Sequence, residues 1–236
     1  MILALSGLII LAGGYAVATW WANQRTAATV VEHTAQALGL TTSLEYASTR
    51  LLTGRIRLSG LAVDNPSAFD APRMILLPRL DGRVRMTTLI RPVVEFSHLT
   101  LTDLELHLER RQGVGNYTMV LGHYVREGRH LGNPDLRIVV DTLVVRDAVV
   151  HLDLVPRLGE AARLSVPIHE LRLTDVGAGR GTPGGELMLQ DGLMLQEVVG
   201  VVLRSVLLAV VDRAAGDIPD ALLRGIREQI EEVPVP

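Results

Sequence analysis

The chain has 236 residues, 48% of them hydrophobic, and a formal net charge of −3, which allows one substantial domain plus a membrane-related segment. It contains no cysteine, which excludes disulfides, thiolate nucleophiles and cysteine-ligated metals. All 23 basic residues are arginines, so a Walker A lysine and a Schiff-base lysine are excluded as well.

The N-terminal segment predicts a transmembrane helix. Residues 2–22, "ILALSGLIILAGGYAVATWWA", contain no charge, and a helix of 21 residues covers the hydrocarbon core of a bilayer. The paired tryptophans at its end are typical of an interfacial aromatic anchor. We expect residues 1–24 to form a membrane anchor. Its characteristic residues are Leu3, Leu8, Ile9, Ile10, Trp20 and Trp21.

A cleaved signal peptide is the alternative interpretation, because "AVA" at 16–18 offers a small-residue cleavage pattern. An uncleaved anchor is favoured, since the apolar run continues through both tryptophans and no basic region precedes it. Residues 25–42 then predict a juxtamembrane helix, for which Gly39 is a suitable end.

Residues 43–190 predict an extracytoplasmic domain of short strands. Apolar and polar residues alternate clearly in "GRIRLSGLAV" at 54–63. Asn65 before Pro66 predicts a loop, and Pro78 predicts an edge position or a bulge. Turn residues every ten to fifteen positions indicate a β-meander.

Residues 50–91 are basic, with eight arginines against three aspartates. Such a section near a membrane would meet anionic headgroups. The favoured interpretation is simpler and places Arg55, Arg57, Arg83 and Arg85 on the solvent side of strands.

Three stretches reverse their strand alternation at an aspartate. In "LTLTDLELHLER" (99–110) the leucines change from odd to even positions after Asp103, and "LVVRDAVVHLDL" (143–154) does the same around Asp147. A shorter version surrounds Asp175. Such a slip turns the buried face outward unless the backbone bulges or kinks. We therefore predict three related β-units with a structural kink at each aspartate.

The C-terminal section, residues 191–236, predicts a helical segment that follows a flexible Gly-rich connection. Amphipathic helices are expected over 194–214 and 219–232, the first buried against the sheet or lying at a membrane surface. The predicted fold is therefore mainly β with flanking helices. It combines an N-terminal transmembrane helix, a curved antiparallel β-sheet and C-terminal amphipathic helices.

The sequence offers no motif for catalysis, a cofactor or a metal ion, and we expect none of the three. His107 and His151 occupy equivalent positions in two units, which would place them near each other on one sheet face. Histidines that are hydrogen-bonded within the protein or exposed to solvent are more common than histidines that bind a metal ion. An enzyme that uses this pair of histidines is a further, less favoured hypothesis. Few aromatics and an acidic chain disfavour nucleic acid as a partner.

The chain resembles the AsmA-like proteins of Gram-negative envelopes in its N-terminal span, in "LSGLAVDNPSAFDAP" and in "LPRLDGRVRMTTLIRPVVEFSHLTLTDLELHLERRQGVGNY". The similarity covers residues 1–120 well and 136–176 loosely. It implies an inner-membrane anchor with a periplasmic β-domain, and larger relatives look like long hydrophobic grooves connected with lipid movement. The residues that match the family pattern are Asn65, Pro66, Phe69, Leu89, Asp103, Gly115 and Asn116.

We therefore expect a non-enzymatic, single-pass inner-membrane protein with most of its chain in the periplasm. Its apolar β-surface would support envelope or lipid organisation, with membrane lipid as partner. The alternative is a structural accessory subunit of a larger inner-membrane complex, for example photosynthetic or respiratory. Gly7, Gly13 and Gly14 would allow close packing of the span against other subunits.

Overall fold

The computed structural model describes the β-domain and the helices that cover it. The predicted anchor (1–24), the predicted helix 219–232 and Leu89 lie outside the described residues. Within the described part of the chain, no helix has both the length and the apolar character needed to cross a membrane. The described residues are 27–28, 30–32, 34–35, 38–50, 52–88, 92–111, 114–117, 119–120, 137–154, 162–178, 192–193 and 195–213.

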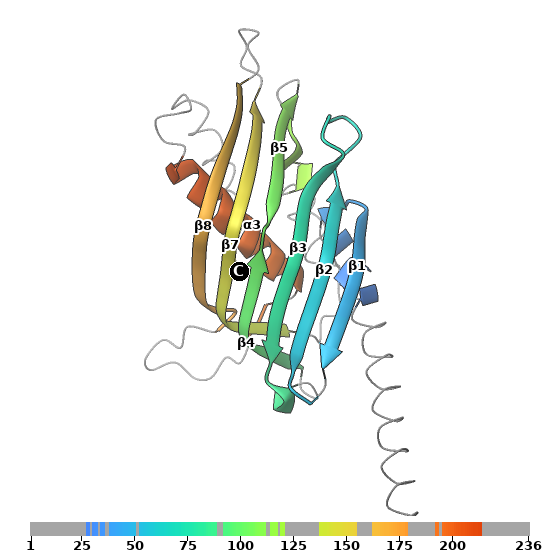
Figure 1. Ribbon diagram of the computed structural model, residues 1–236, viewed down its shortest axis with the longest axis vertical. Coiled ribbons are helices and arrows are strands. Elements are labelled where there is room, and N and C mark those ends of the chain that lie inside the picture. The colour runs from blue at the N-terminus through green and yellow to red at the C-terminus, as the bar shows by residue number, and fades with distance from the viewer. Residues whose placement is uncertain are drawn as a thin grey trace, which may run out of the picture.

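The described strands form one eight-stranded sheet, with helices on one of its faces (Figure 1). The fold is therefore mainly β, as predicted. The strands are β1 (Thr42–Arg50), β2 (Arg55–Asp64), β3 (Arg73–Val84), β4 (Val93–Thr102), β5 (Glu105–Arg111), β6 (Val114–Gly115), β7 (Arg137–Leu154) and β8 (Ala162–Val176), and a short 3-10 helix, η1 (Met86–Thr88), precedes β4.

The sheet is mixed rather than antiparallel, so that part of the prediction is wrong. β1 to β4 are antiparallel neighbours, and β7 pairs antiparallel with β8 but runs parallel to both β4 and β5. Alternation indicates which side chains share a face, but it carries no information on strand direction. A parallel pair needs a long crossover, and 21 residues (116–136) separate β6 from β7.

A row of irregular backbone crosses the sheet near its middle. Asp103 and Asp147 have φ values of 59° and 51°, in the left-handed region that L-residues seldom adopt, and Gly60 has a φ of 67°. The pairing register places Gly60 opposite Pro78, Pro78 opposite Asp103, and Asp103 beside Asp147. We call these four residues the kink row.

The kink row reverses the alternation of the strands that it crosses. Pairs of leucines three residues apart line one cavity on the helix side of the sheet, although in a regular strand such residues face opposite sides. Because neighbouring strands reverse in the same row, their register is kept and the apolar face continues across it. The pairs are Leu58 and Leu61, Leu77 and Leu80, and Leu101 and Leu104.

The leucines of the first unit illustrate the effect of the kink. Leu101, Leu104, Leu106 and Leu108 are all buried, and Leu99 is partly buried against the same core. Without the kink at Asp103, the three leucines that follow it would face the opposite side of the sheet from Leu99 and Leu101. The kink therefore keeps all five leucines in one core.

Asp175 also has a positive φ, 54°, but it lies outside the kink row. It is opposite Asp141 near the end of antiparallel β8, so the third unit is not a spatial repeat of the first two. Of the two positions expected for Pro78, an edge or a bulge, the edge is wrong. Pro78 lies inside the sheet, where the pairing of β3 passes from β5 to β4, and its missing N–H is tolerated in that gap.

The helices cover the inner face of the sheet, which is the far face in Figure 1. α3 (Leu195–Arg213) agrees closely with the helix predicted over 194–214 and is buried against β7 and β8. Helical residues between 27 and 38 lie on the same side, because Val30 and Leu38 share a cavity with α3. The N–H of Gly39, which has a φ of 67°, donates to the carbonyl of Ala35 at 2.8 Å and ends that helix.

Candidate functional site

An apolar cavity of about 160 Å³ lies between the inner face of the sheet and the helices. Its walls come from β2, β3, β4, β5, α3 and the helical residues between 27 and 38, and among the described residues that line it only Thr34 is polar. Apolar cavities of about 150 Å³ stay dry and accept small apolar ligands. The cavity is therefore suited to hydrocarbon and unsuited to a charged ligand.

A stripe of valines on α3 forms much of the helical wall of the cavity, together with Leu203 and the helical residues between 27 and 38. Val198, Val202 and Val206 recur at intervals of four residues, so they lie along one face of the helix. Valine is the shortest of the large aliphatic side chains, and a valine stripe leaves more room against the sheet than leucine would. The opposite wall consists of leucines from both halves of the strands, which the kink row keeps on this face.

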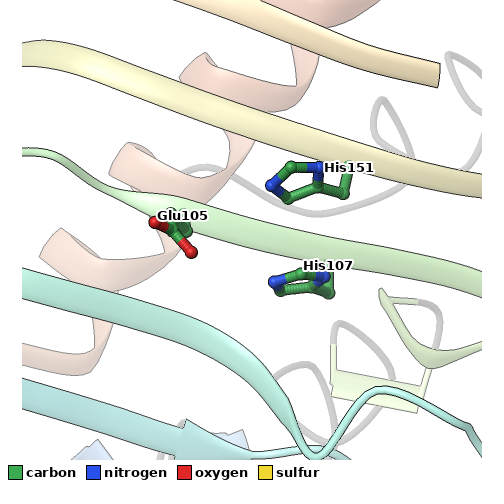
Figure 2. Close-up of side chains that lie close together, drawn as sticks. All are labelled: Glu105, His107 and His151. Atoms are coloured by element: carbon green, nitrogen blue, oxygen red, sulfur yellow. The ribbon is translucent and has the colours of Figure 1, made fainter.

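The outer face of the sheet carries a cluster formed by Glu105, His107 and His151 (Figure 2). Parallel pairing of β5 with β7 places His107 beside His151, and their imidazole rings stack with centroids 4.6 Å apart and an interplanar angle of 21°. Glu105 lies two residues before His107 and therefore shares its face. The metal-binding atoms of the three side chains lie within 4.8 Å of one another.

The surroundings of the two histidines influence their protonation and orientation. Burial, and then the nearby charge of His151, lower the pKa of His107 below its usual 6.5, while Glu105 and Glu109 act in the opposite direction. His107 is thus neutral at pH 7 and keeps a ring lone pair. His151 Nδ1 lies 2.9 Å from Oγ of Ser165 on β8, a contact that orients the second ring.

An open pocket of about 360 Å³ adjoins the two histidines on the outer face. The carboxylates that line it belong to Asp70, Glu109 and Asp153. Carboxylates around a concave site attract cations. Arg111 forms ion pairs with Asp70 and Glu109, so the outer face next to the histidines is polar and carries charges of both signs. It contrasts with the apolar cavity on the inner face.

Glu109 is the buried member of this acidic group, with a relative exposure of 4%. Its Oε1 accepts hydrogen bonds from Asn65 Nδ2 and the backbone N–H of Ala71, both at 2.8 Å. Its Oε2 accepts from the backbone N–H of Asp70 at 2.8 Å. A buried carboxylate is expensive unless it is hydrogen-bonded, and here three donors from one loop satisfy it. Glu109 therefore holds the loop 65–71 against β5.

Asn116 completes this hydrogen-bonding network from the end of β6. Its Nδ2 donates to Asn65 Oδ1 at 3.0 Å and to the carbonyl of His107 at 2.7 Å. Its Oδ1 accepts from the N–H of Glu109 at 3.0 Å. The loop at 65–71 is thus joined to β5 and to the end of β6, and we call Asn65, Glu109 and Asn116 the loop network.

The structure brings two pairs of residues that the sequence singled out into direct proximity. His107 stacks on His151, and Asp103 lies beside Asp147 in the kink row. The N–H of Asp103 donates to the carbonyl of Arg146 at 3.0 Å, which links the two kinks. Both pairs result from the single parallel register in which β7 pairs with β4 and β5.

Sequence reasoning missed Glu105 and Glu109, the two glutamates next to His107. The segment "LELHLE" at 104–109 contains the signal, because strict alternation places Glu105, His107 and Glu109 on one face. Asn65 and Asn116, which the AsmA-like resemblance marked, do meet in the structure. Their partner Glu109 was not anticipated.

No protein-family model matches the chain, and none of the curated proteins matches its sequence. The resemblance to AsmA-like proteins therefore stays a prediction from the residues that carry it. The described residues thus offer two candidate binding sites, which are the apolar cavity on the inner face and the histidine cluster on the outer face.

Proposed function

We propose that the protein is a non-enzymatic, membrane-anchored periplasmic protein of AsmA-like organisation that binds lipid. The apolar cavity carries this proposal, because it would hold part of an acyl chain between the sheet and α3. An anchor formed by residues 1–24 would keep the β-domain next to the inner membrane, where that ligand is abundant.

The chemistry of the cavity favours an acyl chain over a polar ligand. Each methylene group that leaves water for an apolar site contributes about 0.8 kcal/mol. A polar ligand would lose its hydration, and Thr34 is the only described lining residue that could offer a hydrogen bond in return. The described lining thus favours hydrocarbon.

A row of arginines on the outer face supports contact with an anionic membrane surface. Register pairing places Arg50 opposite Arg55, and Arg55 opposite Arg83, and all three residues are exposed. Like charges directly opposite each other are destabilising on a sheet, so an anionic phospholipid headgroup would relieve their repulsion. Membrane lipid is therefore the partner whose acyl chain fits the apolar cavity and whose anionic headgroup fits the arginines of the outer face.

Native mass spectrometry of the full-length protein, released from a mild detergent, tests the proposal. We expect a reproducible mass addition of a phospholipid or fatty acid. Val202→Phe would occupy the cavity and is expected to reduce the lipid-bound fraction at least fivefold. Overpacking costs about 1–3 kcal/mol, so circular dichroism must first show that the variant is folded.

Val114→Phe is the matched control, because Val114 is half exposed on β6 and lies outside the cavity. Its lipid-bound fraction should equal that of the unsubstituted protein. Absence of lipid from the unsubstituted protein would contradict the proposal, as would full retention of lipid by folded Val202→Phe. Lipid-free protein that co-purifies with a membrane subunit in stoichiometric amount would favour the accessory-subunit alternative instead.

A further inference from the structure

We infer that Glu105, His107 and His151 form a binding site for one divalent transition-metal ion on the outer face of the sheet. The site lies on the face opposite to the apolar cavity, and it is independent of lipid binding. Its ligands would be two imidazole nitrogens and one carboxylate oxygen, a set that suits zinc and its neighbours in the first transition row.

The backbone arrangement places the three side chains in reach of one ion. His107 and His151 are register partners on β5 and β7, and Glu105 projects from the same face of β5. Figure 2 shows that one nitrogen of each imidazole points to the side on which Glu105 lies. Two rigid strands therefore present three ligands toward a common point.

The distances fit a site that closes when the ion enters. The candidate ligand atoms lie within 4.8 Å of one another, whereas two ligands on a tetrahedral zinc ion lie about 3.4 Å apart, given bonds of about 2.0–2.2 Å. Side-chain movements of roughly 1–1.5 Å close this difference. A movement of this size is within reach of side-chain torsions, so neither backbone strand has to move.

Ser165 supplies the orientation that metal-binding histidines commonly have. When His151 Nδ1 donates to Ser165 Oγ, 2.9 Å away, Nε2 carries the lone pair that a metal ion needs. Ser165 is the register partner of His151 on β8, so the contact is built into the sheet. Ser165 is a positioning residue here and does not bind the ion itself.

The adjoining pocket fits an ion with an incomplete set of protein ligands. It is open to solvent, so water can fill the remaining coordination positions. Glu109 already uses both of its oxygens in the loop network, which leaves Glu105 as the carboxylate of the site. The predicted stoichiometry is one ion per chain at this site.

Isothermal titration of the full-length, chelator-treated protein with zinc chloride tests the inference. We expect one site at this cluster, with affinity reduced at least tenfold in His107→Gln and in His151→Gln. Ser165→Ala should weaken binding roughly tenfold through the orientation of His151. His98→Gln is the matched control, because His98 is exposed on β4 and should leave the affinity unchanged.

Cobalt absorption provides a readout that a merely structural role would not change. Cobalt(II) bound by two imidazoles and a carboxylate should give visible ligand-field bands in the unsubstituted protein and in His98→Gln, and neither histidine variant should give them. Zinc affinity that is equal in all variants would overturn the inference, and so would magnesium binding as tight as zinc binding. Magnesium prefers oxygen ligands and would then indicate a site made by carboxylates alone.

Discussion

Asn116 Nδ2 donates a hydrogen bond to Asn65 Oδ1 at 3.0 Å, which ties the end of β6 to the loop that follows β2, 51 residues earlier. Glu109 lies at the centre of this contact, since it accepts from Asn65 and from two backbone N–H groups of the same loop. The loop network therefore joins the loop 65–71 to β5 and to the end of β6, a connection that strand pairing does not make.

Replacement of Glu109 by alanine should destabilise the fold by about 3 kcal/mol. The substitution leaves Asn65 Nδ2 and two backbone N–H groups without their acceptor, and unsatisfied groups of this kind cost about 1–3 kcal/mol each when water cannot reach them. Urea unfolding followed by circular dichroism measures the change in free energy.

Glu170→Ala is the control for this prediction. Glu170 forms ion pairs with Arg146 and Arg172 on the exposed part of β7 and β8, and exposed pairs contribute between 0 and about 1 kcal/mol. Equal urea midpoints for Glu109→Ala and Glu170→Ala would show that the loop network does not stabilise the fold.

Asp103 should tolerate glycine better than valine. Its φ of 59° suits glycine, whereas L-residues pay roughly 1–2 kcal/mol in this region and β-branched residues fit it worst. We expect Asp103→Val to be less stable than Asp103→Gly by about 1–2 kcal/mol, as measured by urea unfolding. The same order is expected at Asp147, whose φ is 51°.

Thr100 is the control for this prediction, and we expect the opposite order of stability for its two variants. It lies at a regular position of β4, where it pairs with Asp81 and Val144. Valine favours an extended strand and glycine weakens it, so Thr100→Val should be more stable than Thr100→Gly. If valine were also the better residue at Asp103, the backbone there would not be left-handed in solution.

The stability of the metal-free protein should depend on the ionisation of His107. Burial and the charge of His151 lower the pKa of His107 in the folded state, although Glu105 and Glu109 oppose this, and Asp70 and Asp153 line the adjoining pocket. The unfolded chain therefore binds more protons as the pH falls through 6.5. His107 thus destabilises the fold increasingly below pH 6.5 and has no such effect above it.

His107→Gln removes this titration. Its free energy of unfolding relative to the unsubstituted protein should rise between pH 7.5 and pH 5.5, in the presence of a chelator. Urea titrations at three pH values measure the difference. A relative loss of stability by the variant on acidification would mean that the folded protein favours the charged imidazole.

Much of the local structure was readable from the leucines and aspartates. The alternation around Asp103 and Asp147 could be interpreted because only a backbone irregularity keeps Leu101 and Leu104 on one face. The length of α3 followed from its long apolar run in the same way. Each of these features depends on side chains close together in sequence.

Other features lay beyond sequence reasoning because they depend on strand partners. Gly60 lies in a segment that reads as a regular strand, and Pro78 predicted only an edge or a bulge in its own strand. Only the register shows that both continue the kink row that contains Asp103. Glu105 was likewise one charge among many until β7 placed His151 within reach. The alternation of side chains along a strand shows which residues share a face of the sheet, whereas strand pairing decides which residues of different strands lie side by side.

The sequence by itself determined which leucines of the first unit face the core, the kinks at Asp103 and Asp147, and the course of the C-terminal helix, because periodicity and backbone preference are properties of neighbouring residues. The tertiary structure decided that β7 lies parallel to β4 and β5, and with it the stacking of His107 on His151 and the alignment of the kinks. That choice depends on how a long connection brings distant strands together. No local pattern encodes it, although the histidine cluster depends on it.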